Sequence, residues 1–181
     1  MKIYFTSDCH FDHNNIIEYT DRPFKNVKHM NDEIIKRWNS VVSKDDLVYH
    51  IGDFAFKGQL NAKKFENKLN GDIVHIRGNH DKNNGIKTYI DKAMMFFGGK
   101  DVFVQHHPPE VLPICDFAIC GHVHQHWKFK LLKTNPSIPI INVGVDVNDF
   151  TPVSTFSLLK QYNKIRFKYC KSNKYGEYKV I

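Results

Sequence analysis

Three short runs of β-branched and aromatic residues mark the first half of the chain, and each has the length of a buried strand. They span residues 2–7, 46–51 and 72–77. A small cluster of polar residues follows each run without a gap. Parallel strands bring their carboxyl ends to one edge of a sheet, so this order predicts an α/β sheet with a functional site at that edge.

Helical patterns separate these strands. Apolar residues recur at helical spacing within residues 27–42, which predicts an amphipathic helix. Residues 59–69 are rich in lysine and end at an Asn-Gly pair, which is typical of a helix terminus. A third, short helix is expected around residues 86–91.

Strands dominate the second half of the chain. We predict them near residues 93–97, 101–105, 117–120, 139–143 and 154–160. Residues 164–181 have the pattern of a basic hairpin that turns at Ser172-Asn173 or Tyr175-Gly176. This crowding of strands favours a second sheet packed on the first. We therefore expect one domain over residues 1–181, with strands and a hairpin over about 154–181.

Five polar clusters carry residue types that bind metal ions or transfer protons. They are Asp8-Cys9-His10, Gly52-Asp53, Gly78-Asn79-His80-Asp81, His106-His107-Pro108 and Gly121-His122-Val123-His124. Each cluster alone is a weak signal, because similar pairs occur in ordinary turns. Together they hold several imidazoles, carboxylates and an amide oxygen, and all of them lie at or just after predicted strand ends. This combination predicts a metal site.

The spacing within the clusters indicates what single residues could do. Asp8 and His10 lie two residues apart, so an extended backbone turns both side chains to one side. A carboxylate such as Asp53 can bridge two cations with its two oxygens. Asp81 could hold the neighbouring His80 imidazole in one tautomer, as carboxylates do at many histidine sites.

Two choices among the histidines stay open on spacing alone. Either His106 or His107 could be a ligand. The pair His122 and His124 could also be shifted by two residues to include His126, although Gly121 favours the first pair. A closed structural zinc site needs only four ligands, often cysteines, and this set is larger and richer in oxygen. It suits two divalent cations about 3.5–4 Å apart, a common device for cutting phosphate esters.

Bulk composition narrows the choice of partners. The formal net charge is +7, but the lysines are scattered and not interleaved with aromatic residues, which favours a solvated surface over a nucleic-acid groove. No apolar run approaches the about 18 residues of a membrane span. The four cysteines form no C-x-x-C pair, and residues 1–5 lack the apolar region of a signal peptide. We expect a cytoplasmic protein without a membrane partner.

Taken in order, the clusters resemble the signature of calcineurin-like metallophosphoesterases: D-x-H, G-D, G-N-H-(D/E), H and G-H-x-H. All five blocks lie within residues 8–124. Segments 22–24, 38–40 and 142–146 are similar to a subgroup of small, uncapped bacterial and phage members. The resemblance implies the α/β class and a four-layer α/β-β/α sandwich of two mixed sheets flanked by helices.

The resemblance also implies a role for each candidate residue. It assigns Asp8, His10 and His124 to one metal ion, Asn79, His106 and His122 to a second, and Asp53 to both. His106 is preferred over His107 because it stands two residues before Pro108, as the family histidine does. His80 would be the catalytic histidine that is not a ligand, with Asp81 orienting it. Asn79, His80 and His13 would contact the phosphate.

The expected function is that of a dinuclear metal-dependent phosphoesterase. Manganese is the first choice of metal because oxygen donors are numerous, with iron, zinc and nickel as alternatives. Hydroxide held between the two cations would attack phosphorus, and His80 would protonate the leaving oxygen. The expected substrate is a small nucleotide or a related diester. The alternatives are a phosphomonoesterase, a protein phosphatase or a nuclease of the same superfamily, and a metal-binding scaffold for a protein partner.

Overall fold

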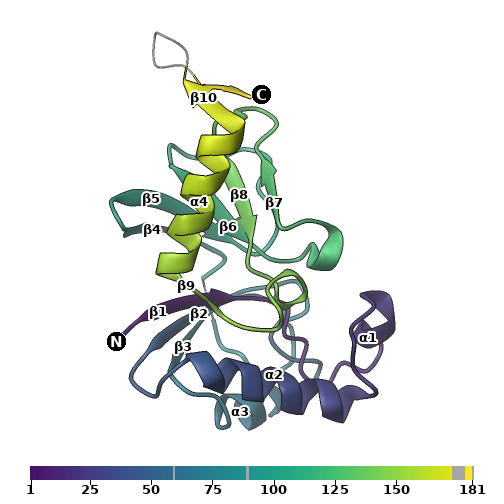
Figure 1. Ribbon diagram of the computed structural model, residues 1–181. Coiled ribbons are helices and arrows are strands. Elements are labelled where there is room, and N and C mark those ends of the chain that lie inside the picture. The colour runs from purple at the N-terminus through teal and green to yellow at the C-terminus, as the bar shows by residue number, and fades with distance from the viewer. Residues whose placement is uncertain (59, 89, 173–177, 181) are drawn as a thin grey trace.

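The computed structural model describes residues 1–58, 60–88, 90–172 and 178–180 (Figure 1). The helices are α1 (Ile16–Tyr19), α2 (Val27–Val41), α3 (Asn61–Glu66) and α4 (Thr155–Tyr169), with 3₁₀ turns η1 (His124–His126) and η2 (Val145–Val147). The strands are β1 (Ile3–Thr6), β2 (Leu47–Ile51), β3 (Asp72–Ile76), β4 (Lys92–Phe97), β5 (Lys100–Gln105), β6 (Phe117–Cys120), β7 (Phe129–Leu131), β8 (Pro139–Asn142), β9 (Val153–Ser154), β10 (Cys170–Ser172) and β11 (Tyr178–Val180).

The first sheet has the strand order β3-β2-β1-β9. β1, β2 and β3 run parallel, with Phe5 opposite Tyr49 and Tyr49 opposite Val74, and β9 pairs antiparallel with β1. Parallel neighbours need crossover connections, which here contain α2 between β1 and β2 and α3 between β2 and β3. The carboxyl ends of the three strands therefore share one edge, as the sequence predicts.

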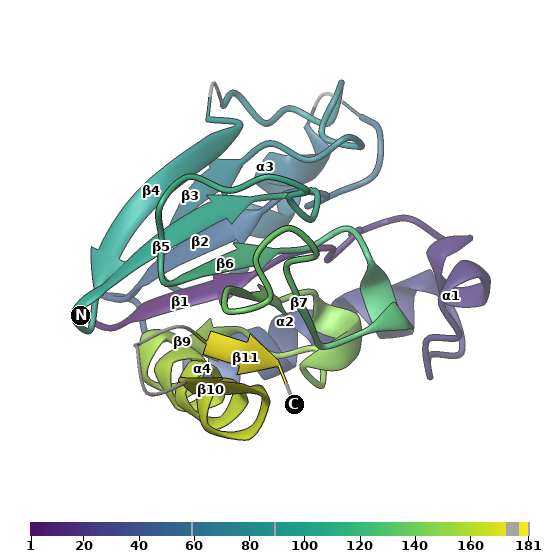
Figure 2. The same ribbon diagram turned by 90° about the horizontal axis from the view of Figure 1, so that it is seen from above.

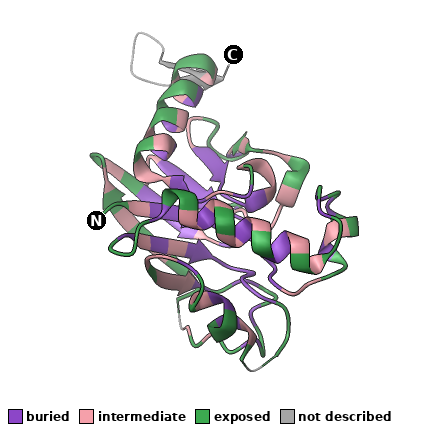
Figure 3. Ribbon diagram, turned by 60° about the horizontal axis from the view of Figure 1, so that its bottom comes forward, coloured by how far each residue is buried: buried purple, intermediate pink, exposed green. Residues whose placement is uncertain are grey.

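Helix α2 shows how the hydrophobic pattern becomes structure. Met30, Ile34 and Trp38 are buried along one face, and Figure 3 shows buried and exposed segments alternating along the helix. The Asn26 side chain accepts a hydrogen bond from the backbone N–H of His29 at 2.9 Å. Such a cap typically stabilises a helix by about 1 kcal/mol. The predicted helix over residues 27–42 is confirmed.

The second sheet has the strand order β4-β5-β6-β8-β7. Its central strands β5, β6 and β8 are parallel, and the edge strands β4 and β7 are antiparallel to their neighbours. A shared hydrophobic core joins the two sheets and α4; it includes Phe5 and Ile76 from the first sheet, Phe117 and Ile141 from the second, and Leu158 from α4. Figure 2 shows one sheet over the other, with α4 along one side. The predicted α/β fold of two mixed sheets flanked by helices is confirmed.

The strand predicted over residues 154–160 is wrong. Only residue 154 of that range belongs to β9, and α4 follows at once. The buried positions Leu158, Tyr162 and Ile165 have the helical period, which becomes visible only in a window that extends past residue 160. The Ser154 hydroxyl accepts a hydrogen bond from the backbone N–H of Ser157 at 3.2 Å, which favours the start of this helix.

The C-terminal hairpin is also shorter than predicted. Helix α4 takes up residues 164–169, and the hairpin consists of β10 paired antiparallel with β11. Ser172 still belongs to β10, and the remaining residues of both predicted turns lie outside the described residues.

Two further helix predictions differ from the structure. The helix predicted over residues 59–69 is confined to α3, and turns follow it. The short helix around residues 86–91 is not formed by the described residues there. Instead, the Thr88 hydroxyl donates to the His75 carbonyl at 2.6 Å and the Arg77 N–H donates to the Ile90 carbonyl at 2.8 Å. These bonds hold the segment beside β3 and compete with helical pairing.

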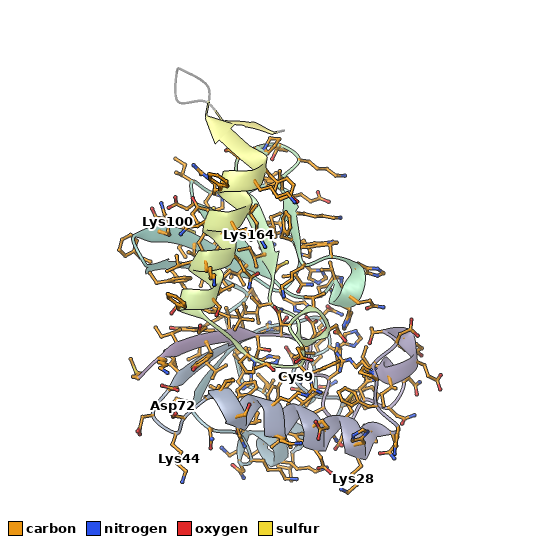
Figure 4. The ribbon with its side chains drawn as sticks, viewed as in Figure 1. Cys9, Lys28, Lys44, Asp72, Lys100 and Lys164 are labelled. Carbon is orange, nitrogen blue, oxygen red and sulfur yellow. The ribbon has the colours of Figure 1, made fainter. Side chains whose placement is uncertain are left out.

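The four lysines labelled in Figure 4 are spread over the molecule. Lys28, Lys44, Lys100 and Lys164 lie on different parts of the molecule, whereas Cys9 lies inside the fold (Figure 4). Among the described residues, no helix has both the length and the apolar character needed to cross a membrane.

Candidate metal centre

The loops that follow the parallel strands of both sheets supply the candidate site. They carry Asp8 and His10 after β1, Asp53 after β2, Asn79 after β3, His106 after β5, His122 and His124 after β6, and Asp146 after β8. The topology therefore brings residues from distant parts of the chain to one edge of the two-sheet core, as expected for parallel strands.

Five of these residues have a left-handed backbone. The φ angle is 60° at Asp8, 49° at His10, 59° at Asp53, 70° at His122 and 44° at His124. This region is uncommon for residues other than glycine, and strained positions of this kind cost of order 1–3 kcal/mol each. Such backbone persists where the surrounding structure fixes it, and it gathers at functional sites.

Two glycines allow the strand ends to approach one another. A Cβ on Gly78 would collide with the side chain and the backbone of Asp53. A Cβ on Gly121 would collide with the Ser7 hydroxyl and would lie 2.6 Å from Oδ2 of Asp8. The glycines of the polar clusters thus serve the close packing of the loops that carry the acidic residues.

The first group of candidate ligands consists of Asp8, His10 and His124, whose donor atoms all lie within 4.8 Å of one another. Nδ1 of His124 lies 2.8 Å from Oδ2 of Asp146. Because Asp146 also accepts a hydrogen bond from Nε of Arg22 at 2.8 Å, its carboxylate is the acceptor and His124 is the donor. This leaves Nε2 of His124 available for a metal ion, in the way that carboxylates orient many histidine ligands.

One buried nitrogen in this group has no protein partner. Nε2 of His10 forms no hydrogen bond with any described residue, and Oδ2 of Asp53 lies 3.5 Å away. Buried polar atoms without a partner are rare in folded proteins. The ring is 2% exposed, so bulk water does not supply the missing contact. A metal ion bound between His10 and Asp53 would supply it.

The second group consists of Asn79, His106 and His122. Oδ1 of Asn79 lies 3.1 Å from Nε2 of His106 and 3.1 Å from Nδ1 of His122. Nδ1 of His106 donates to the Ile51 carbonyl at 2.8 Å, so Nε2 is the nitrogen that faces the site. Burial lowers the pKa of His122 to about 4, so this imidazole is neutral at pH 7, as a metal ligand must be.

Asp53 connects the two groups. Its Oδ2 lies 3.5 Å from Nε2 of His10 and 3.2 Å from Nε2 of His106, while Oδ1 accepts from the backbone N–H of His80 at 2.8 Å. Burial alone would raise the pKa of Asp53, but the hydrogen bond and charge of His106, together with His10, hold it below its ordinary value. Burial would lower the pKa of His106, yet Asp53 and Asp8 raise it to about 9. A cation bound here would take the place of this proton.

The neighbouring histidines that spacing leaves open differ in burial. His106 is buried, whereas His107 is exposed with its ring centroid 3.9 Å from that of His122. His106, His107 and His122 also form a group with donor atoms within 4.8 Å, so His107 lies at the edge of the second group. His126 is exposed and belongs to no such group within the described chain.

His80 and His13 lie on the side of the first group. The His80 ring is exposed, with its centroid 5.4 Å from that of His10 and 6.4 Å from that of His13. Nδ1 of His13 accepts a hydrogen bond from the backbone N–H of Ile16 at 3.1 Å. Nε2 of His13 therefore carries the proton and can donate to an anion, as the expected phosphate contact requires.

Asp81 makes different contacts from the expected one with the His80 ring. Its buried carboxylate accepts from the backbone N–H groups of Asp53 at 2.8 Å, Phe54 at 2.9 Å and Gly78 at 2.7 Å. Both carboxylate oxygens are thus occupied by the backbone. Asp81 therefore fixes the loop that carries Asp53.

Sequence reasoning assigns no role to Arg22 or Asp146, although both are close to the site. The Arg22 guanidinium donates to the backbone carbonyls of Asp8 at 2.7 Å and Cys9 at 3.1 Å, and it also pairs with Asp146. The signal that could have identified Asp146 is its place after the predicted strand over residues 139–143. The other candidate residues follow their strands in the same way.

Two mixed sheets flanked by helices, with histidines, aspartates and an asparagine gathered at the carboxyl ends of parallel strands, define a metal-binding α/β protein of the metallophosphoesterase type. The calcineurin-like phosphoesterase superfamily domain matches residues 1–160, and the chain belongs to this superfamily.

The chain is also similar to proteins from an archaeon, a bacteriophage and a bacterium. It is 38% identical over 167 residues to an uncharacterized protein from Methanocaldococcus jannaschii, covering 90% of this chain and 92% of the relative. It is 36% identical over 81 residues to the Gene 66 protein of Mycobacterium phage L5, covering 43% of this chain and 39% of that protein. A crystal structure of a protein of unknown function from Aquifex aeolicus has a TM-score of 0.70 and 27% identity, covering 88% of this chain and 98% of that one.

Proposed function

We propose that the protein is a dinuclear metal-dependent phosphodiesterase that hydrolyses a small nucleotide or a related phosphate ester. The position of Asp53 carries this proposal. One of its carboxylate oxygens, Oδ2, lies 3.5 Å from a nitrogen of the first group, on His10, and 3.2 Å from a nitrogen of the second, on His106. A single carboxylate within reach of two ligand groups is what a pair of cations needs to stay together.

The donor set fits two divalent cations. Asp8, His10 and His124 would hold one ion, Asn79, His106 and His122 the other, and Asp53 both. Bound cations of this kind lower the pKa of a water molecule to near neutrality and withdraw charge from phosphoryl oxygens. The mixture of carboxylate, amide and imidazole donors suits manganese, with iron, zinc and nickel as alternatives.

His80 would donate a proton from its ring to the leaving oxygen as the phosphorus–oxygen bond breaks. Its backbone is tied to Asp53 by the 2.8 Å hydrogen bond, while its ring is exposed and free to meet a substrate. Proton transfer by a positioned side chain contributes about 10²- to 10⁴-fold to a rate. His13, which has a proton on Nε2, would donate a hydrogen bond to a phosphoryl oxygen.

The test compares hydrolysis of bis-p-nitrophenyl phosphate and p-nitrophenyl phosphate with added Mn²⁺. The wild type should cleave the diester, and Asp53→Asn should abolish that cleavage. Asp45→Asn is the matched control, because Asp45 is exposed in the turn before β2 and its variant should keep wild-type activity. Cleavage of the monoester alone would make the protein a phosphomonoesterase. A lack of activity on both esters with manganese, iron, zinc and nickel ions added in turn would contradict the proposal and favour a binding scaffold.

A further inference from the structure

A pocket of about 520 Å³ lies beside the candidate metal centre. Leu132 and Ile140, both almost fully buried, belong to the hydrophobic cluster on the outer face of the second sheet and form its base. Half-buried Trp127 packs against the same cluster, and Pro108 and Pro109 line the pocket with it. The volume and the largely apolar walls are those of a site for a small organic group.

The pocket adjoins the candidate metal centre. Its lining includes His107, whose ring centroid lies 3.9 Å from that of the candidate ligand His122. Val123, which also lines it, stands between His122 and His124 in the chain. A group bound in this pocket would therefore be close enough to belong to the same molecule as a phosphate bound at the centre.

The lining has the chemistry that recognises a flat aromatic group on an anion. Trp127 offers an aromatic surface, and its backbone carbonyl is held by the Asn142 side chain at 2.9 Å. The ammonium group of Lys130 lies 5.1 Å from the centroid of the Trp127 ring, and Lys133 also lines the pocket. Glu110 is the one carboxylate among the described lining residues, so the pocket has an excess of positive charge. An uncharged aliphatic chain would use neither lysine.

The position of His80 indicates which part of a diester would occupy the pocket. His80 lies beside His10, in the first group, whereas His107 lies beside His122, in the second. A leaving group that accepts a proton from His80 would point away from the pocket. The other substituent, which stays on the phosphate, would then point past His107 toward Trp127.

We infer that this pocket binds the base of a nucleotide diester, with the base stacked on Trp127 and the lysine ammonium groups facing the carbonyl oxygens of the base. The inference rests on the proposed function and makes it more specific, since it names the retained substituent as a nucleoside. It also assigns substrate specificity to Trp127, a residue outside every metal-binding group of the described chain.

The experiment uses two esters with the same leaving group, the p-nitrophenyl ester of thymidine 5′-monophosphate and methyl p-nitrophenyl phosphate. The ratio of their kcat/KM values isolates the retained substituent. We expect wild type to favour the thymidine ester, and Trp127→Ala to lower this ratio by about tenfold, as loss of a base–aromatic stack does. Trp127→Phe should retain most of the preference. Phe167→Ala, which removes an exposed aromatic side chain from α4, should leave the ratio at its wild-type value.

The outcomes separate the pocket from the reaction. Cleavage of both esters with the same ratio in wild type and Trp127→Ala would refute the pocket and leave the proposed reaction intact. If neither ester is cleaved, the proposed reaction fails, and binding of thymidine 5′-monophosphate to the purified protein decides about the pocket. Thymidine 5′-monophosphate should quench the tryptophan fluorescence of wild type but not that of Trp127→Phe, whose remaining tryptophan is the buried Trp38. That result would support the pocket. A lack of quenching in wild type would refute it.

Discussion

Of the polar contacts around the site, the ion pair between Asp146 and Arg22 should cost the most folding free energy when one partner is replaced. The Arg22 side chain is 0% exposed and the Asp146 side chain 3%. Asp146 accepts from Nε of Arg22 at 2.8 Å, from its terminal nitrogen at 3.0 Å and from Nδ1 of His124 at 2.8 Å. Replacement of Asp146 by asparagine keeps the shape of the side chain and removes its charge. Arg22 is then a buried cation without a counterion.

The expected loss in the free energy of unfolding is about 3–5 kcal/mol at pH 7, the usual effect of breaking a buried ion pair from one side. Burial would raise the pKa of Asp146, but the hydrogen bond from His124 and the charge of Arg22 hold it below its ordinary value. A carboxyl with a lowered pKa stabilises the fold above its unfolded pKa, and that stability is lost as the pH falls through the folded pKa. The difference between wild type and Asp146→Asn should therefore shrink below about pH 4. It should also decrease as the pH rises above about 6.5, because the hydrogen bond and charge of Asp146 raise the pKa of His124 and that contribution is lost as His124 deprotonates.

Urea denaturation in the presence of EDTA measures this effect without bound metal. Asp149→Asn is the matched control, because Asp149 also pairs with an arginine, Arg37, but its side chain is 89% exposed. An exposed pair contributes about 0–1 kcal/mol, so the control should unfold almost like wild type. Metal affinity should fall by about 10- to 100-fold in Asp146→Asn, because His124 loses its orienting partner. Equal unfolding free energies for the two variants would refute the reasoning.

Three further predictions follow from the site. His80→Ala should retain its metal ions, measured by elemental analysis, and slow the cleavage of diesters with alkyl leaving groups by about 10²- to 10⁴-fold; an unchanged rate would exclude its role as the acid. Because the pKa of His106 is raised to about 9 without metal, Mn²⁺ binding should release a proton below that pH and tighten as the pH rises toward it. Calorimetry in two buffers of different ionisation enthalpy detects the proton, and identical heats would contradict the prediction. Gly121→Ala should lose metal binding, since its methyl group would collide with Ser7; a metal content equal to that of wild type would show that the loop can adjust.

The order of strands and helices in the first half could be predicted because short apolar runs alternate with segments that have apolar residues at helical spacing. A short window reveals both β1, as a continuous run of buried residues, and α2, as buried positions at helical spacing. The first turns of α4 lack this clarity, because Val153 and Thr155 favour extended backbone and the helical period emerges only with Tyr162 and Ile165.

Contacts between distant residues could not be predicted in the same way. Arg22 and Asp146 are 124 positions apart, and no local pattern connects them. Asp81 has the spacing of a residue that orients His80, yet the backbone around Asp53 occupies its oxygens. The pocket beside His107 likewise combines residues of three loops with β7 and β8, so only the folded chain reveals it.

The central claim is that Asp53 joins two metal ions in one site. The most direct test is the metal content of the protein after incubation with Mn²⁺ and removal of unbound ions, measured by elemental analysis for wild type, Asp53→Asn and the control Asp45→Asn. The account predicts two ions in wild type and in the control and at most one in Asp53→Asn. One ion or none in wild type, or two ions in Asp53→Asn, would contradict it.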